Sequence, residues 1–128
     1  MSEIKWLPKE AVLAMHARQL AEHGGGTGVR DLGLLDSALQ RPQNKKDYES
    51  PDMADLAAAY AYGIARNHPF IDGNKRTALV ASRTFLLING YQITAHNDER
   101  LRTFMALAAG SLTEDDLATW FRKHMIKV

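Results

Sequence analysis

Residues 73–90, GNKRTALVASRTFLLING, are the part of the sequence most typical of a buried helix. Its ends carry helix signals: a start near Gly73 or Asn74, and an Asn-Gly stop at 89–90. Between 78 and 88 the segment is apolar on most faces, interrupted only by three polar residues. A helix that is apolar nearly all round is a buried one. We therefore expect a central buried helix here, around which the rest of the chain packs.

Helical periodicity continues on both sides of this segment and predicts five further helices. The first is expected at about 8–23, with Leu13, Ala17 and Leu20 on its buried face and Gly24 beyond its end. The others are expected at about 31–40, at 52–67, from 97 or 98 onward and from 113 onward. Residues 91–94 are expected to be briefly extended. The sequence thus predicts an all-α fold, a single domain over residues 1–128 with about six helices.

Residues 42–51, PQNKKDYESP, are polar, bounded by prolines and without a helical stripe. Proline lacks a backbone N–H, and its ring clashes with the preceding turn of a helix. We therefore expect the second helix to stop at Pro42 and an exposed loop, a short flap, to follow it up to Pro51.

The composition narrows the class of protein. Of 128 residues, 45% are hydrophobic and 24% charged, which predicts one packed domain rather than a disordered chain. A formal net charge of only +1 argues against a protein built to bind nucleic acid or a membrane surface. The absence of cysteine excludes disulfides and thiolate metal sites. The N-terminus lacks a signal-peptide core and no apolar run could span a bilayer, so we expect a soluble cytoplasmic protein.

A short loop between the third and fourth predicted helices carries the residues suited to chemistry, His68-Pro69-Phe70-Ile71-Asp72-Gly73-Asn74-Lys75-Arg76. The start of a helix offers unpaired N–H groups and a partial positive charge, which suit an anion, and a glycine lets a ligand approach the backbone. Lys75 and Arg76 lie in the first turn, where the helix dipole disfavours cations. A bound polyphosphate would explain them. The alternative is that they are ordinary surface charges.

His68, Asp72 and Phe70 complete this set. An imidazole titrates near neutral pH and can take a proton from an attacking hydroxyl. Asp72 could hold Mg²⁺, which bridges phosphate groups, or it could simply cap the helix. Phe70 is expected to anchor the loop to the core. The segment therefore matches what phosphoryl-type transfer requires, namely positioning and charge stabilisation.

The other candidates are interpreted as structural. The glycine-rich stretch 24–28 lacks the Lys-Ser/Thr of a P-loop, so we expect a turn with no role in nucleotide binding. The histidines outside the loop are expected to be surface or core residues: His16, His23, His96 and His124.

Residues 68–76 resemble the signature of the Fic/Doc superfamily, His-Pro-Phe-x-Asp/Glu-Gly-Asn-Gly/Lys-Arg. The glycines at 24–26, the segment RDLGLLDSAL at 30–39 and the short chain look like the Doc (death-on-curing) branch, whose members are usually toxins of toxin–antitoxin pairs. The resemblance implies an α-helical fold and a role for each position: general base for His68, core anchor for Phe70, Mg²⁺ ligand for Asp72, anion-binding nest and phosphate contact for Gly73 and Asn74, and phosphate-binding pair for Lys75 and Arg76.

Two departures from the main Fic pattern look like Doc. Lys75 stands where nucleotidyl-transferring Fic proteins usually have glycine, and Leu79 where they have a second arginine. Doc-type proteins bind ATP the other way round and transfer its γ-phosphate to a threonine of elongation factor Tu, which stops translation. The resemblance therefore implies a protein Ser/Thr kinase that uses ATP and Mg²⁺. Pro69 is more typical of Fic, so AMP transfer to a protein hydroxyl stays an alternative.

The resemblance also implies partners. The flap of such proteins docks the target as an added strand, and residues 42–51 are the matching segment. The inhibitory Ser/Thr-x-x-x-Glu-Gly/Asn pattern of some Fic proteins is absent from the sequence, so inhibition is expected from a separate cognate antitoxin. The expected target is a translation factor. A catalytically silent module that binds the antitoxin or nucleic acid is the alternative of another class, and the near-zero net charge argues against nucleic acid.

Overall fold

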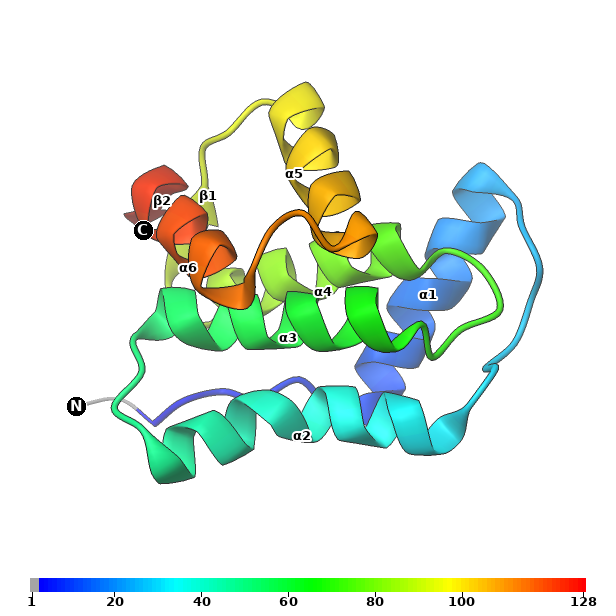
Figure 1. Ribbon diagram of the computed structural model, residues 1–128, viewed down its shortest axis with the longest axis horizontal. Coiled ribbons are helices and arrows are strands. Elements are labelled where there is room, and N and C mark those ends of the chain that lie inside the picture. Colours follow the sequence, from blue (N-terminus) through cyan, green and yellow to red (C-terminus); the bar gives the residue numbers. More distant parts are fainter. Residues whose placement is uncertain (1–2) are drawn as a thin grey trace.

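The computed structural model describes residues 3–128, which form six helices and a two-stranded antiparallel sheet (Figure 1). The sequence did not predict the second strand, which pairs with the first so that Tyr91 lies opposite Lys127. The predicted all-α class with about six helices is confirmed. In chain order the elements are α1 (Lys9–His23), α2 (Leu32–Tyr48), α3 (Met53–Asn67), α4 (Asn74–Ile88), β1 (Tyr91–Ile93), α5 (Asn97–Ala109), α6 (Glu114–His124) and β2 (Met125–Lys127).

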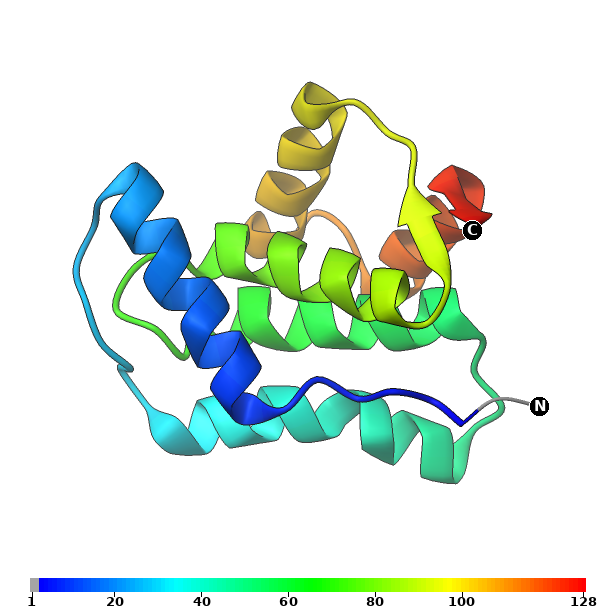
Figure 2. The same ribbon diagram turned by 180° about the vertical axis from the view of Figure 1, so that it is seen from behind.

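The central helix is α3, and not α4 as the sequence suggested. α3 packs against α2, α4, α5 and α6 (Figure 1 and Figure 2), and ten of its fifteen residues are buried. α4 buries seven of fifteen and leaves Leu87 and Ile88 exposed. Side-chain size explains the difference, because the small residues of α3 let its neighbours come close. At Gly63, an added Cβ would lie 3.0 Å from the Ala38 Cα of α2.

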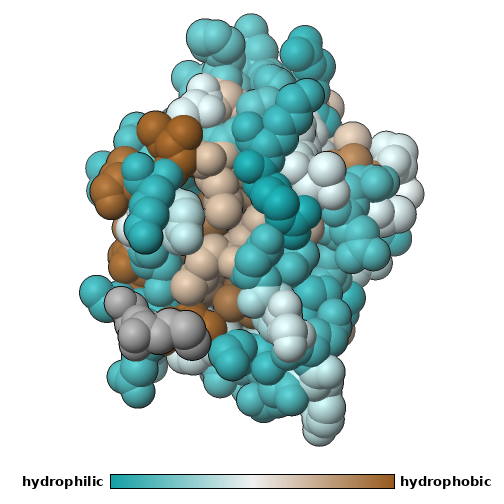
Figure 3. Space-filling view, turned by 90° about the vertical axis from the view of Figure 1, so that its left-hand side faces the viewer, coloured by the Kyte–Doolittle hydropathy of each residue, from teal (hydrophilic) through white to brown (hydrophobic). Residues whose placement is uncertain are grey.

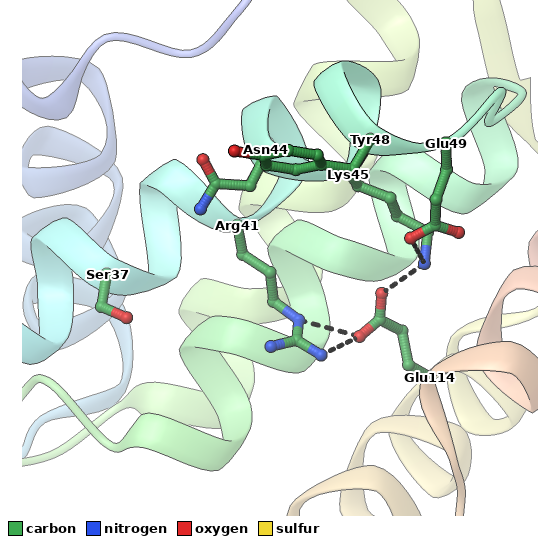
Figure 4. Close-up of a pocket in the computed structure, with 7 residues that line it drawn as sticks. All are labelled: Ser37, Arg41, Asn44, Lys45, Tyr48, Glu49 and Glu114. Atoms are coloured by element: carbon green, nitrogen blue, oxygen red, sulfur yellow. Dashed lines mark hydrogen bonds and ion pairs between the residues drawn. The ribbon is translucent and has the colours of Figure 1, made fainter.

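The expected flap at residues 42–51 is wrong in structure and in position. α2 continues through Pro42, which is buried. On either side of it, Arg41 and Lys45 both point toward Glu114 of α6 (Figure 4) and bond to its carboxylate at 2.8 and 3.1 Å. These contacts tie the part of α2 around Pro42 to the start of α6. This end of α2 lies at the opposite end of the molecule from the α3–α4 loop (Figure 1).

α1 lies within one residue of its predicted bounds, but its buried face is displaced. Val12 and His16 are buried, whereas Leu13 and Leu20 are partly buried and Ala17 is exposed. An α-helix has 3.6 residues per turn, so a displacement of one position along the sequence rotates the buried face by about 100°. The displacement brings His16 into the interior, next to the α3–α4 loop.

Figure 3 shows the end of the molecule that lies away from the α3–α4 loop. Patches of hydrophobic surface there alternate with hydrophilic side chains. The chain ends here, and Ile126 and Val128 are 52% and 68% exposed. Among residues 3–128, no helix is both long and apolar enough to cross a membrane.

Candidate functional site

The loop between α3 and α4 lies against the segment that joins α1 to α2, residues 24–31 (Figure 2). Val29 and Phe70 form an isolated antiparallel bridge, held by hydrogen bonds of 2.7 and 3.1 Å between the two backbones. The glycine-rich stretch 24–28, expected to be a turn with no role in nucleotide binding, therefore lies beside the loop and contacts it through Gly28.

Asn74 fastens the loop to α4. Its Oδ1 accepts from the Phe70 N–H and its Nδ2 donates to the Phe70 carbonyl, both at 3.0 Å. Asn74 is 6% exposed and Phe70 1%, so these bonds are shielded from water. The side-chain amide of Asn74 is thus engaged at both ends, which leaves its backbone N–H as the group that can meet a phosphate.

His16 of α1 supports the same loop from the core side. Its Nε2 donates to the Asp72 carbonyl at 2.8 Å. Its ring stacks on that of Phe70, with centroids 3.7 Å apart and planes inclined by 8°. Sequence patterning did not separate His16 from a surface histidine. Its place four residues after Val12, on one helix face, is the signal that could have done so.

α3 ends at Asn67, as predicted, and His68 follows in a left-handed conformation with φ 49° and ψ 56°. Pro69 disfavours helical geometry at the residue before it. The guanidinium of Arg30 secures the turn, because it donates to the carbonyls of Asn67 at 2.9 Å and His68 at 2.7 Å. This fixed turn leaves His68 exposed to solvent, where a substrate hydroxyl can reach its imidazole.

Asp72 lies just before α4, and its residue is exposed. Its Oδ1 accepts from the Gly73 N–H at 2.9 Å, and its Oδ2 lies 3.4 Å from the Gly26 nitrogen. The carboxylate does not cap α4, because the N-cap is Gly73 and, within residues 3–128, no side chain accepts from the N–H groups of the first turn of α4. Residues 3–128 contain no group of three or more His, Cys, Asp or Glu that could hold a metal ion. A single carboxylate still suits Mg²⁺, which proteins commonly hold by one or two carboxylates while phosphates and waters complete its shell.

The N-terminus of α4 is open. Gly73 takes a φ of 78°, and the N–H groups of Asn74, Lys75 and Arg76 form no hydrogen bond with any part of residues 3–128. Lys75 and Arg76 are exposed, and within the same residues neither side chain takes part in an ion pair. Free N–H groups, the helix dipole and two cations are thus concentrated in one turn, which suits a phosphate group.

The α3–α4 loop and the start of α4 lie at one end of the molecule (Figure 2). Both His68 and Asp72 belong to this loop. The two cations lie differently. Arg76 lines a cleft between α1, α4 and α5 whose walls include neither His68 nor Asp72, and Lys75 is not part of that cleft. The site accordingly has two parts, the open N-terminus of α4 and a neighbouring basic cleft. Arg76 belongs to both, because it lies in the first turn of α4 and lines the cleft.

Several known proteins resemble this chain, and residues 6–86 match the Fic/DOC family. The chain is 47% identical to Toxin Doc of Mycolicibacterium smegmatis over 98 residues, 73% of this chain and 72% of the relative. It is 30% identical to Protein kinase doc of Escherichia phage P1 over 121 residues, 94% of this chain and 95% of the relative. Protein adenylyltransferase Fic of Drosophila ananassae is 38% identical over 64 residues, 50% of this chain and 13% of that protein. On the extent of these matches, the chain belongs to the Fic/DOC family.

Proposed function

We propose that this chain is a Doc-type toxin that phosphorylates a Ser or Thr hydroxyl of a protein, with ATP as the phosphate donor. The observation that carries the proposal is the open N-terminus of α4, with Lys75 and Arg76 in its first turn and exposed His68 and Asp72 on the loop before it. Two relatives that match most of the chain, named Toxin Doc and Protein kinase doc, support it.

In this proposal the γ-phosphate of ATP binds at the start of α4. The N–H groups of residues 74–76 bind its oxygens, while Lys75 and Arg76 neutralise charge that develops during transfer. His68 accepts the proton of the attacking hydroxyl as its oxygen bonds to the γ-phosphorus; the bond from that phosphorus to the bridging oxygen breaks, and ADP leaves. Asp72 would hold Mg²⁺, which would supply positive charge to the phosphates of the donor.

Two residues favour transfer of the γ-phosphate over transfer of AMP. Lys75 places a long cation beside the helix end where nucleotidyl-transferring Fic proteins usually have glycine. Leu79 lies one turn further along α4. In AMP transfer the α-phosphate of ATP is attacked, and the uncharged side chain of Leu79 could not bind the γ-phosphate of an ATP molecule in that orientation. The match to the Drosophila adenylyltransferase covers 50% of the chain, against 73% and 94% for the two Doc proteins. AMP transfer is the second candidate, because Pro69 follows the Fic pattern.

A protein target would dock beside residues 24–31 rather than along residues 42–51. Residues 24–31 pair with the loop at Phe70 and reach the carbonyl of His68 through Arg30. An extended target segment added next to this backbone would bring its hydroxyl to the imidazole. We propose a translation factor as the target and a separate antitoxin as the inhibitor.

ATP labelled in the γ or the α position, incubated with the chain and purified translation factors, tests the proposal. We expect protein label from the γ position, reduced about 10²- to 10⁴-fold in His68→Ala because the general base is lost. His96→Ala is the matched control, since His96 is also exposed and lies before α5. Label from the α position alone would leave AMP transfer as the function. Growth arrest that persists on expression of His68→Ala would instead favour a non-catalytic binding module.

A further inference from the structure

We propose that Arg30 is a positioning residue, which orients the imidazole of His68 by holding the main chain on both sides of it. Arg30 lies in the segment between α1 and α2, 38 positions before His68. Its Nε donates to the His68 carbonyl at 2.7 Å, and its Nη2 donates to the Asn67 carbonyl at 2.9 Å. The inference rests on the proposed function in one respect, because it takes His68 as the base of the reaction.

The conformation that Arg30 holds is an unfavourable one. His68 has a φ of 49° and a ψ of 56°, and within residues 3–128 it is the only residue other than glycine with a positive φ. A residue with a Cβ avoids this left-handed region unless its surroundings hold it there. His68 also follows the last turn of α3, where the backbone carbonyls lack partners inside the helix. The guanidinium supplies a donor to two of these carbonyls in succession, so the turn depends on it.

Backbone hydrogen bonds complete the support of this turn. The N–H groups of Arg30 and Asp31 donate to the Pro69 carbonyl at 2.7 and 3.1 Å. On the other side, the His68 N–H donates to the Ile64 carbonyl at 3.3 Å. Every polar backbone group next to His68 is therefore paired. This pairing fixes the φ and ψ of His68, and with them the direction of its Cα–Cβ bond.

The imidazole of His68 is not oriented by another side chain. A catalytic histidine is commonly oriented by a hydrogen bond between its second ring nitrogen and a third group. Within residues 3–128 the His68 imidazole has no such partner, in contrast to the imidazoles of His16 and His124. Its orientation therefore comes from the main chain, and Arg30 is the side chain that holds this main chain in place.

The residue type fits this role. Within residues 3–128 Arg30 forms no ion pair, whereas Arg41 and Arg122 both bond to carboxylates. The N–H groups of a guanidinium diverge at fixed angles and can reach two acceptors at once, while the ammonium of lysine is a point charge on a flexible stem. Replacement by lysine therefore keeps the charge of Arg30 and removes the fixed geometry of its two hydrogen bonds.

NMR order parameters of the backbone N–H groups, together with steady-state kinetics, test the inference on variants that urea unfolding shows to be folded. The order parameter of the His68 N–H should be about 0.85 in the wild type and roughly 0.6 or less in Arg30→Ala. In the same variant, kcat for phosphate transfer should fall about 10- to 100-fold while KM for ATP stays within about twofold, because the base is misplaced and the phosphate site is not. Arg41→Ala is the matched control and should change neither quantity, since it loses its bond of 2.8 Å to Glu114 far from the α3–α4 loop.

Arg30→Lys separates the hydrogen bonds from the charge. We expect it to restore the order of His68 and kcat together, and each only in part, because lysine lacks the fixed fork of donors. Recovery of kcat without recovery of order would show that the charge acts by itself, and would overturn the inference. A wild-type order parameter for His68 in Arg30→Ala, or a loosened His68 with wild-type kcat, would overturn it as well. The order parameters need no transfer to a hydroxyl, so a chain that labels no protein but whose His68 loosens in Arg30→Ala would refute the kinase proposal alone.

Discussion

Replacement of Asn74 by alanine should destabilise the protein more than any replacement of the exposed residues in the α3–α4 loop. The substitution removes both bonds of 3.0 Å to the Phe70 N–H and carbonyl, in a place where Phe70 is 1% exposed. A buried backbone group left without a partner costs about 1–3 kcal/mol. Two such groups therefore predict a loss of roughly 2–6 kcal/mol in the free energy of unfolding, a large part of the stability of a domain this size.

Urea and thermal unfolding of purified Asn74→Ala measure this loss, and a change of about 3 kcal/mol corresponds to a fall in Tm of roughly 10 °C. Asn74→Asp should be no more stable than Asn74→Ala, because the second carboxylate oxygen would face the Phe70 carbonyl, to which the Asn74 side-chain N–H now donates. Asn44→Ala, on the exposed side of α2, is the matched control and should stay within about 0.5 kcal/mol of the wild type. An Asn74→Ala protein as stable as that control would show that the two bonds do not hold the loop.

Three further predictions concern other contacts. His16→Phe keeps the aromatic stack on Phe70 but loses the hydrogen bond to the Asp72 carbonyl. The rate of phosphate transfer should therefore fall about tenfold or more, while the free energy of unfolding falls by only about 1 kcal/mol. An unchanged kcat would show that this hydrogen bond does not position the loop. Gly63→Ala should lower the urea midpoint by the equivalent of about 1–3 kcal/mol, because its Cβ would crowd the α2 backbone at 3.0 Å, and a stabilised variant would contradict the packing. Hydrogen bonds from Arg122 hold the pKa of Asp52 at about 2, below its model-peptide value of 3.8, so this pair stabilises the fold above about pH 4 and the contribution is lost as pH falls toward 2. Because both side chains are about half exposed, Arg122→Gln should cost less than about 1 kcal/mol at neutral pH, and a stability difference from wild type that persisted undiminished at pH 2 would exclude the pair as its cause.

The helix ends could be predicted because their determinants are local. Asp52 and Thr113 cap α3 and α6 in reciprocal bonds with residues three positions on, and Asn89 with the glycine after it ends α4. The loop at 68–76 could be recognised for the same reason, because its candidate site residues follow one another in the sequence. Each of these features depends on only a few neighbouring side chains, so the local sequence is sufficient to predict it.

The features that could not be predicted depend on distant partners. Pro42 stays inside α2 although a proline usually ends a helix, and Glu114 of α6 holds Arg41 and Lys45 beside it. His16 meets Asp72 across 56 positions of sequence. Burial of α3 rather than α4 follows from the packing of α2, α4, α5 and α6 against α3. The partners in each of these contacts are far apart in the sequence, so local patterns do not predict them.

The candidate site shows the same limit. The motif indicated that Asn74 would contact phosphate, but its side chain is engaged with Phe70, so that any such contact must come from its backbone N–H. The motif likewise paired Lys75 with Arg76, whereas only Arg76 lines the neighbouring cleft. A motif fixes which residues are close along the chain, and the packing of α1 and α5 against α4 decides which space each side chain enters.

A crystal structure of the chain with a non-hydrolysable ATP analogue would show whether the start of α4 binds a phosphate of the donor. We predict a phosphate group within hydrogen-bonding distance of the N–H groups of residues 74–76, with its phosphorus close to the imidazole of His68. An analogue bound elsewhere, with the start of α4 hydrated and His68 away from every phosphorus, would contradict it.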